Sequence, residues 1–157
     1  MAQAIGAVIG FDVHAEGTGV EQTLVAGGTH TFRSDTYAAF GGSDSAPSPL
    51  LYALGALSSC NQVTASLVAR DLGIQLGRWT FDVRGDLDPA VLVTGADGDA
   101  NFRAVHIAVS VETDASAEQF VRLSQETERR CPVTQLFRRS GLAYRSSWVA
   151  TALPASV

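Results

Sequence analysis

Hydrophobic and polar residues follow two different periods along this chain. Near the start, residues 5–14, 20–26 and 30–34 alternate between apolar and polar side chains, and glycine-rich turns separate them. Such short alternating runs predict three strands. Over residues 49–72 the apolar positions recur instead at the spacing of an α-helix, and Gly73 supplies a stop signal.

The predicted helix over residues 49–72 is apolar almost all the way round. Ser48 suits its N-cap and Pro49 its first position, where a missing N–H group does no harm. No charged residue occurs between Ser45 and Ala69. Serine, asparagine, glutamine and threonine are too frequent here for a membrane span, so we expect a central, buried helix.

The second half of the chain combines strands with helices. Residues 76–88 and 101–113 alternate cleanly and predict a long antiparallel hairpin. A capping box begins a second helix over residues 116–130, and a short helix over residues 131–139 follows it. Residues 142–150 predict a last strand. The order of elements indicates an α+β fold.

Length and charge limit the possible domain organisation, partners and cellular compartment. The 157 residues suit a single domain, residues 1–157, with a large core because 46% of them are hydrophobic. A net charge of −5 offers no electrostatic footprint for a polyanion, so we expect no nucleic-acid partner. The first residues, MAQAIGAVIGFDV, lack the basic segment of a secretory signal. We therefore expect a cytoplasmic protein with no membrane association, in a reducing compartment that disfavours permanent disulfides.

The two cysteines are the residues with the clearest chemical potential. Cys60 and Cys131 are 131 − 60 = 71 positions apart, so only the fold can bring them together. Cys131 precedes Pro132, which places its sulfur near a helix N-cap, where free N–H groups favour negative charge. Arg129 and Arg130 add positive charge beside it. Because the thiolate is the reactive form, these features indicate a reactive thiol, while a packing thiol chosen for size remains the alternative.

Cys60 allows two interpretations. It lies inside the predicted central helix, where a free cysteine often acts as a small hydrophobic residue. The residues around it are small and polar, which indicates a lined cavity instead; they are Ser58, Ser59, Asn61 and Gln62. The three histidines match no ligand spacing with either cysteine, so we expect no metal and no other cofactor.

Two motifs resemble those of a known family. The segment FRSDTYAAFGGSDSAPSPLLYALGALSSC resembles the loop and central helix of the osmotically inducible protein C and organic hydroperoxide resistance (OsmC/Ohr) superfamily, where the helix carries the first cysteine. The tetrapeptide CPVT, which Cys131 opens, resembles the motif of the second cysteine. The resemblance spans residues 30–149 and implies an OsmC-like fold, with antiparallel sheets around a long central buried helix in an intertwined homodimer.

The resemblance also implies an activity. Cys60 would attack an organic hydroperoxide and become a sulfenic acid, and Cys131 would resolve it as a disulfide. A small dithiol or a lipoyl protein would then act as the reductant. An apolar pocket lined by residues such as Leu54, Leu57 and Phe137 would favour lipid-like or aromatic peroxides.

The chain departs from the family pattern at one important place. The peroxidases of the superfamily have a glutamate after the proline that opens the central helix, paired with an arginine from the first strands. Here Leu50 and Leu51 follow that proline, and the turn HAEGTGVEQ contains no arginine. Arg33 is the candidate cation in its place. The alternatives to a peroxidase are an OsmC-like protein that binds a small hydrophobic ligand or uses its thiols in another redox reaction, and a dimer with inert thiols.

Overall fold

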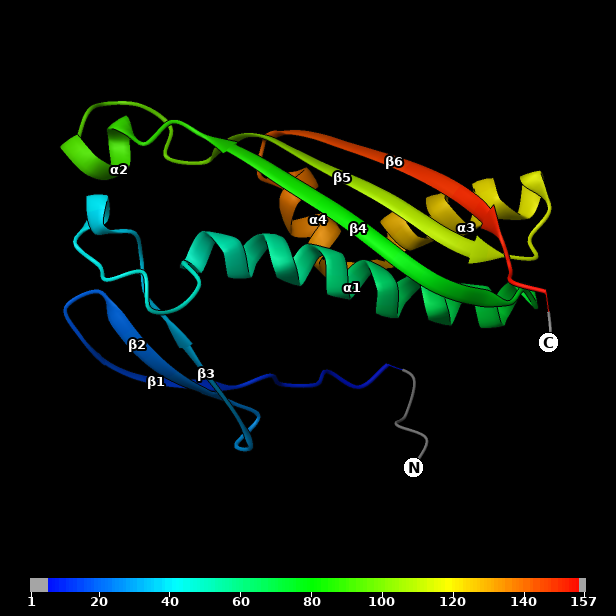
Figure 1. Ribbon diagram of the computed structural model, residues 1–157, viewed down its shortest axis with the longest axis horizontal. Coiled ribbons are helices and arrows are strands. Elements are labelled where there is room, and N and C mark those ends of the chain that lie inside the picture. Colours follow the sequence, from blue (N-terminus) through cyan, green and yellow to red (C-terminus); the bar gives the residue numbers. More distant parts are fainter. Residues whose placement is uncertain (1–5, 156–157) are drawn as a thin grey trace. The chain divides into compact units, whose positions relative to one another are not determined.

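The structure, a computed structural model, describes residues 6–155 (Figure 1). The chain divides into two compact units, of which the first ends at Tyr52 and the second begins at Ala53. That the whole chain acts as a single domain stays a prediction.

The first unit contains a three-stranded antiparallel sheet in the order β1-β2-β3. Its strands are β1 (Val13–Thr18), β2 (Glu21–Ala26) and β3 (His30–Ser34), so the second and third predicted strands are confirmed. The first strand begins later than predicted, because residues 6–12 form no strand; residue 5 lies outside the described part of the chain. It also continues through Gly17, where a turn was expected. A Cβ at Gly17 would clash with the Glu21 carbonyl, so the glycine permits the close pairing of the two strands.

A loop leads from this sheet towards the long helix, and the buried carboxylate of Asp35 organises it. The loop includes a short 3₁₀ helix, η1 (Ala38–Phe40). Asp35 accepts hydrogen bonds from the backbone N–H groups of Thr36 at 2.7 Å and Ser45 at 2.8 Å. The hydroxyls of Ser43 and Ser45 donate to it at 2.8 and 3.0 Å. These donors, above all the Ser45 N–H group, hold the pKa of Asp35 well below its usual range although burial raises it.

The long helix α1 (Pro49–Leu72) has the bounds that the sequence predicted. The Ser48 hydroxyl caps it by accepting the N–H of Leu51 at 3.4 Å. Within a single chain, however, the helix is buried along one face only. The buried positions recur every three or four residues and are Leu57, Asn61, Thr64, Ala65, Val68 and Ala69. Other apolar side chains of the helix are exposed, among them Leu50, Leu51, Val63 and Leu67.

The second unit contains a sheet in the order β4-β5-β6 (Figure 1). Strands β4 (Leu76–Leu87) and β5 (Phe102–Thr113) form the predicted antiparallel hairpin, and a short helix α2 (Ala90–Thr94) that was not predicted lies in their connection. Strand β6 (Ala143–Ala152) pairs with β5 in parallel, so the expectation of purely antiparallel sheets is wrong for this pair. The reason is the helical crossover between the two strands, which returns the chain to the end where β5 began.

Two helices make up that crossover. Helix α3 (Ala117–Arg130) begins with the predicted capping box of Ser116 and Gln119, and helix α4 (Pro132–Arg139) follows after one residue. The core forms two clusters in which side chains of α1 pack against the sheet and the crossover. The wholly or almost wholly buried members include Leu57, Val68, Val105, Ile107 and Leu123. The predicted α+β class is confirmed. Within residues 6–155, no helix has both the length and the apolar character that crossing a membrane requires.

The Asp35 carboxylate gives a test of this loop. In Asp35→Asn, an amide NH₂ group replaces one of the oxygens that face N–H donors, so we expect a lower melting temperature at neutral pH. The wild-type advantage requires the charged carboxylate, and the folded state depresses its pKa. It is therefore fully present above the ordinary carboxyl pKa of about 3.9 and is lost as the pH falls towards the folded value.

The matched control is Asp44→Asn, because Asp44 is exposed and its φ of 56° is one that asparagine also adopts. Melting curves of both variants between neutral and acidic pH provide the measurement. A deficit in Asp35→Asn that is the same at every pH would contradict the account.

Candidate active site at the paired thiols

The structure brings the two cysteines to the same place. Cys60 lies in the middle of α1 and is half-buried, whereas Cys131 lies between α3 and α4 and is fully buried. Both are free thiols. The Cys131 thiol interacts directly with the Cys60 thiol and raises its pKa. The two sulfurs are therefore neighbours, although 71 positions separate the cysteines in the sequence.

The first turn of α4 interacts with both sulfurs. Cys131 is the N-cap of α4 and Pro132 opens the helix, as predicted. The Cys131 sulfur accepts the N–H of Thr134 at 3.4 Å. The N–H group of Val133 interacts with the Cys60 sulfur and lowers the pKa of that thiol. Since the first N–H groups of a helix have no partner within it, they stabilise negative charge on atoms that face the helix N-terminus.

Burial nevertheless keeps Cys60 neutral at ordinary pH. Its pKa is raised above the usual value of a thiol, and burial is the largest cause. The neighbouring Cys131 thiol adds to the rise, while the Val133 N–H group and the Thr64 hydroxyl oppose it. The two opposing groups are neutral dipoles, which compensate for desolvation less well than a full positive charge does. The reduced Cys60 thiol thus holds its proton more tightly than an activated catalytic thiol does.

Apolar and aromatic side chains surround this part of the unit. Leu54, Leu57 and Phe137, the residues expected to line an apolar pocket, belong to one hydrophobic cluster, in which Leu57 is fully buried. Tyr144 packs against the same cluster. Burial raises the pKa of Tyr144 to about 12, while Thr134 acts in the opposite direction. The tyrosine hydroxyl therefore stays protonated at physiological pH.

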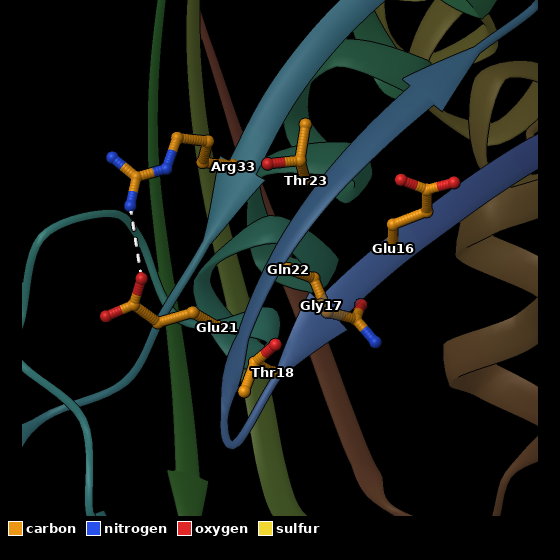
Figure 2. A pocket seen from close by; sticks show the side chains of 7 residues that line it. All are labelled: Glu16, Gly17, Thr18, Glu21, Gln22, Thr23 and Arg33. Carbon is orange, nitrogen blue, oxygen red and sulfur yellow. Dashed lines mark hydrogen bonds and ion pairs between the residues drawn. The ribbon is translucent and has the colours of Figure 1, made fainter.

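Arg33, the third candidate residue, lies in the first unit on β3. Its guanidinium donates to the Glu21 carboxylate at 3.3 Å (Figure 2). It also donates to the Ser45 hydroxyl at 3.4 Å. Both side chains of the ion pair line a shallow polar cup of about 220 Å³ on the sheet. Sequence reasoning missed Glu21 as the partner of Arg33. The hairpin register contains the signal, because Arg33 pairs with Thr23 and Glu21 is its diagonal neighbour on the same face.

No metal-binding cluster accompanies the thiols. In the part of the chain that the structure describes, no group of three or more histidine, cysteine, aspartate or glutamate residues is placed to hold a metal ion. The arrangement places two sulfurs, the N–H groups of Val133 and Thr134 and the neutral hydroxyl of Thr64 in an apolar setting. Chemically, it is suited to reversible formation of a disulfide.

The sequence matches one protein-family model. The family is described as OsmC-like protein, and the match covers residues 42–143, which include both cysteines. No curated protein matches the sequence.

The fold is similar to several solved structures. An OsmC-like protein from Mycoplasma pneumoniae superposes with a TM-score of 0.77 at 17% identity, over 91% of this chain and 98% of the other. An organic hydroperoxide resistance protein from Elizabethkingia anophelis superposes with a TM-score of 0.69 at 15% identity, over 95% and 100% of the two chains. A protein from Legionella pneumophila, also named an organic hydroperoxide resistance protein, gives a TM-score of 0.67 at 16% identity, over 91% and 98%. At these identities the likeness shows the fold alone.

The groups that interact with the Cys60 thiol predict how its pKa changes in two variants. Cys131→Ser removes a neighbour that raises the pKa of Cys60, so we expect that pKa to fall. Thr64→Val removes a hydroxyl that lowers it, so we expect it to rise. The rate of alkylation of Cys60 by iodoacetamide as a function of pH gives the titration midpoint of each protein. The effect of Thr64→Val is measured with Cys131 also replaced by serine, and this double variant is compared with Cys131→Ser alone. Midpoints that do not move, or that move in the reverse directions, would show that these groups do not contact the Cys60 sulfur.

Proposed function

The chain belongs to the OsmC-like protein family, and from that premise we propose that it is a thiol peroxidase that reduces organic hydroperoxides. The observation that carries the proposal is the pair of adjacent free thiols at the first turn of α4. One thiol is half-buried and its neighbour is fully buried. This difference supports separate roles for the two sulfurs.

Cys60 is the thiol that meets the peroxide, because it is the more exposed of the two. Its thiolate attacks the terminal oxygen of the hydroperoxide, an S–O bond forms and the O–O bond breaks. The alkoxide takes up a proton and leaves as the alcohol. Cys60 has then been oxidised to a sulfenic acid.

Cys131 completes the cycle. Its sulfur attacks the sulfur of the Cys60 sulfenic acid, an S–S bond forms, the S–O bond breaks and water leaves. The full burial of Cys131 protects it from direct oxidation and keeps it for this step. A dithiol, either a small molecule or a lipoyl protein, then reduces the disulfide by thiol–disulfide exchange. No metal or organic cofactor takes part in the proposed cycle.

The ionised fraction of Cys60 limits the rate of the first step. Because the thiolate is the nucleophile and burial raises the pKa of this thiol, little of it is ionised at neutral pH. The rate of oxidation therefore increases with pH up to a midpoint above the ordinary thiol value. A substrate or a partner that lowers the pKa would accelerate the reaction.

We propose Arg33 as the cation that lowers the pKa of Cys60 during the reaction. Its ion pair with Glu21 reproduces, on strands β2 and β3, the arginine–glutamate pairing that family resemblance implies for the start of α1. Helix α1 has Leu50 and Leu51 there instead.

We also propose that the protein acts as a cytoplasmic homodimer. The exposed apolar side chains of α1 are a reason for a dimer, since a second chain would remove them from water; they include Val63, 62% exposed, and Leu67, 41% exposed.

The peroxidase proposal predicts a specific product. One equivalent of cumene hydroperoxide should join Cys60 to Cys131 within one chain, and mass spectrometry should find the two peptides linked with the loss of a pair of hydrogens. Cys60→Ser should abolish peroxide consumption. Cys131→Ser should still be oxidised at Cys60 but should accumulate sulfenic and sulfinic acids. A Cys60→Ser protein that consumes peroxide at the wild-type rate would exclude the proposal.

The alternative, a protein that binds a small hydrophobic ligand without peroxidase activity, gives a different result. It predicts no peroxide-dependent disulfide, together with a ligand-induced rise in melting temperature that survives replacement of both cysteines.

A separate variant tests Arg33. Arg33→Gln removes the proposed cation, so the second-order rate constant for oxidation of Cys60 should fall by about tenfold or more. Arg84→Gln is the matched control, because Arg84 is exposed on β4 and pairs with Asp86 beside it. Stopped-flow measurement of thiol loss gives both rate constants. Equal rates for Arg33→Gln and the wild type would remove Arg33 from the proposed site.

A further inference from the structure

A buried polar bridge connects α1 with α4 beside the two thiols. Asn61, the residue after Cys60, is 1% exposed, and Thr134 is 0% exposed. The side-chain amide of Asn61 donates to the Thr134 hydroxyl at 2.9 Å and to the Leu57 carbonyl at 2.8 Å. The first of these bonds joins positions 73 residues apart in the sequence. It fixes the first turn of α4 against α1 at the level of Cys60.

The same threonine also holds the second sulfur. The Thr134 backbone N–H donates to the Cys131 sulfur at 3.4 Å. A short path therefore runs from Cys60 through the peptide bond to Asn61, across the side-chain hydrogen bond to Thr134, and back to Cys131. Each of the two cysteines has one end of the bridge beside it.

Stability does not account for the bridge. The Asn61 Oδ1 atom and the Tyr144 hydroxyl are buried and have no hydrogen-bond partner within residues 6–155. Thr134 is close enough to Tyr144 to lower its pKa, so both unpaired atoms belong to side chains that interact with this threonine. A buried polar atom without a partner is destabilising, and an apolar side chain of similar shape at position 61 would avoid it. Buried unpaired groups in native structures call for an explanation, and a functional role is a common one.

We propose that Asn61 and Thr134 are positioning residues for disulfide formation between Cys60 and Cys131. The inference deepens the proposed peroxidase function and rests on it for the identity of the oxidant. Disulfide formation requires Cα atoms about 4.4–6.8 Å apart and a restricted torsion about the S–S bond. A thiol held in that geometry reacts as though its local concentration were very high. The bridge supplies that restraint by tying the backbone next to one cysteine to the N-cap turn of the other.

In the step concerned, the Cys131 thiol gives up its proton, its sulfur attacks the Cys60 sulfur, the S–S bond forms and the bond from Cys60 to its leaving group breaks. After oxidation by a hydroperoxide the leaving group is hydroxide, which takes up that proton and departs as water; after reaction with oxidised glutathione it is glutathione thiolate. The restraint acts in the same way with either oxidant. The first step, attack by Cys60 on the oxidant, does not involve Cys131 and therefore does not depend on the restraint.

Two replacements of Thr134 test the proposal. Thr134→Val keeps the branched shape and the backbone N–H but removes the hydroxyl that accepts from Asn61, whereas Thr134→Ser keeps a hydroxyl. In Thr134→Val the disulfide should form about tenfold more slowly than in the wild type, while loss of the Cys60 thiol in the first step stays within about twofold. With excess cumene hydroperoxide, mass spectrometry should find a larger share of Cys60 as sulfinic acid. Thr134→Ser should restore the wild-type ratio of disulfide to sulfinic acid.

A double-mutant cycle identifies the partner. Asn61→Leu alone should reproduce the Thr134→Val result, and the double variant should be no slower than either single variant because the same bond is removed. If Asn61→Leu does not fold, the comparison of Thr134→Val with Thr134→Ser still decides the question. Disulfide formation in Thr134→Val at the wild-type rate, or an equal loss in Thr134→Ser, would overturn the proposal.

Oxidised glutathione separates this inference from the peroxidase function. If cumene hydroperoxide leaves the wild-type thiols unchanged but oxidised glutathione yields the Cys60–Cys131 disulfide, slowly in Thr134→Val and normally in Thr134→Ser, then the positioning role holds and the peroxidase function fails. If both oxidants give the disulfide at equal rates in all three proteins, the positioning role fails and the peroxidase function stands.

Discussion

The sulfurs of Cys60 and Cys131 both interact with N–H groups in the first turn of α4, in an apolar setting. The remaining features of the site depend on that arrangement. Burial removes water from the Cys60 thiol and raises its pKa, while the N–H group of Val133 lowers the pKa of that thiol. For Cys60, burial is the stronger effect. Reduced Cys60 is therefore not a permanently ionised nucleophile.

The surrounding fold brings the two thiols together. Helix α1 packs its buried stripe against the sheet, and the helical crossover from β5 to β6 delivers Cys131 to the middle of α1. Because the crossover makes β6 parallel to β5, the position of Cys131 and the topology of the sheet have a common origin. In the first unit, Asp35 gives comparable order to the loop that precedes α1.

Local patterns in the sequence predicted most of the elements. The bounds of α1, the capping box at Ser116 and the place of Cys131 at a helix N-cap follow from short-range chemistry, and all are confirmed. The resemblance to the OsmC/Ohr superfamily is confirmed by the family match over residues 42–143. The parallel pairing of β6 and the Asn61–Thr134 bond escaped prediction, because each joins positions far apart whose pairing no local pattern specifies. The Arg33–Glu21 ion pair was missed although the register of the β2–β3 hairpin contains its signal.

The proposed chemistry requires the sulfurs of Cys60 and Cys131 to lie side by side in the reduced protein. A trivalent phenylarsenical, which bridges two neighbouring thiols and resists displacement by a monothiol, measures this without any oxidant. We expect one arsenical bound per wild-type chain in the presence of excess monothiol, and none in Cys60→Ser or Cys131→Ser. Failure of the wild-type protein to retain the arsenical under the same conditions would contradict it.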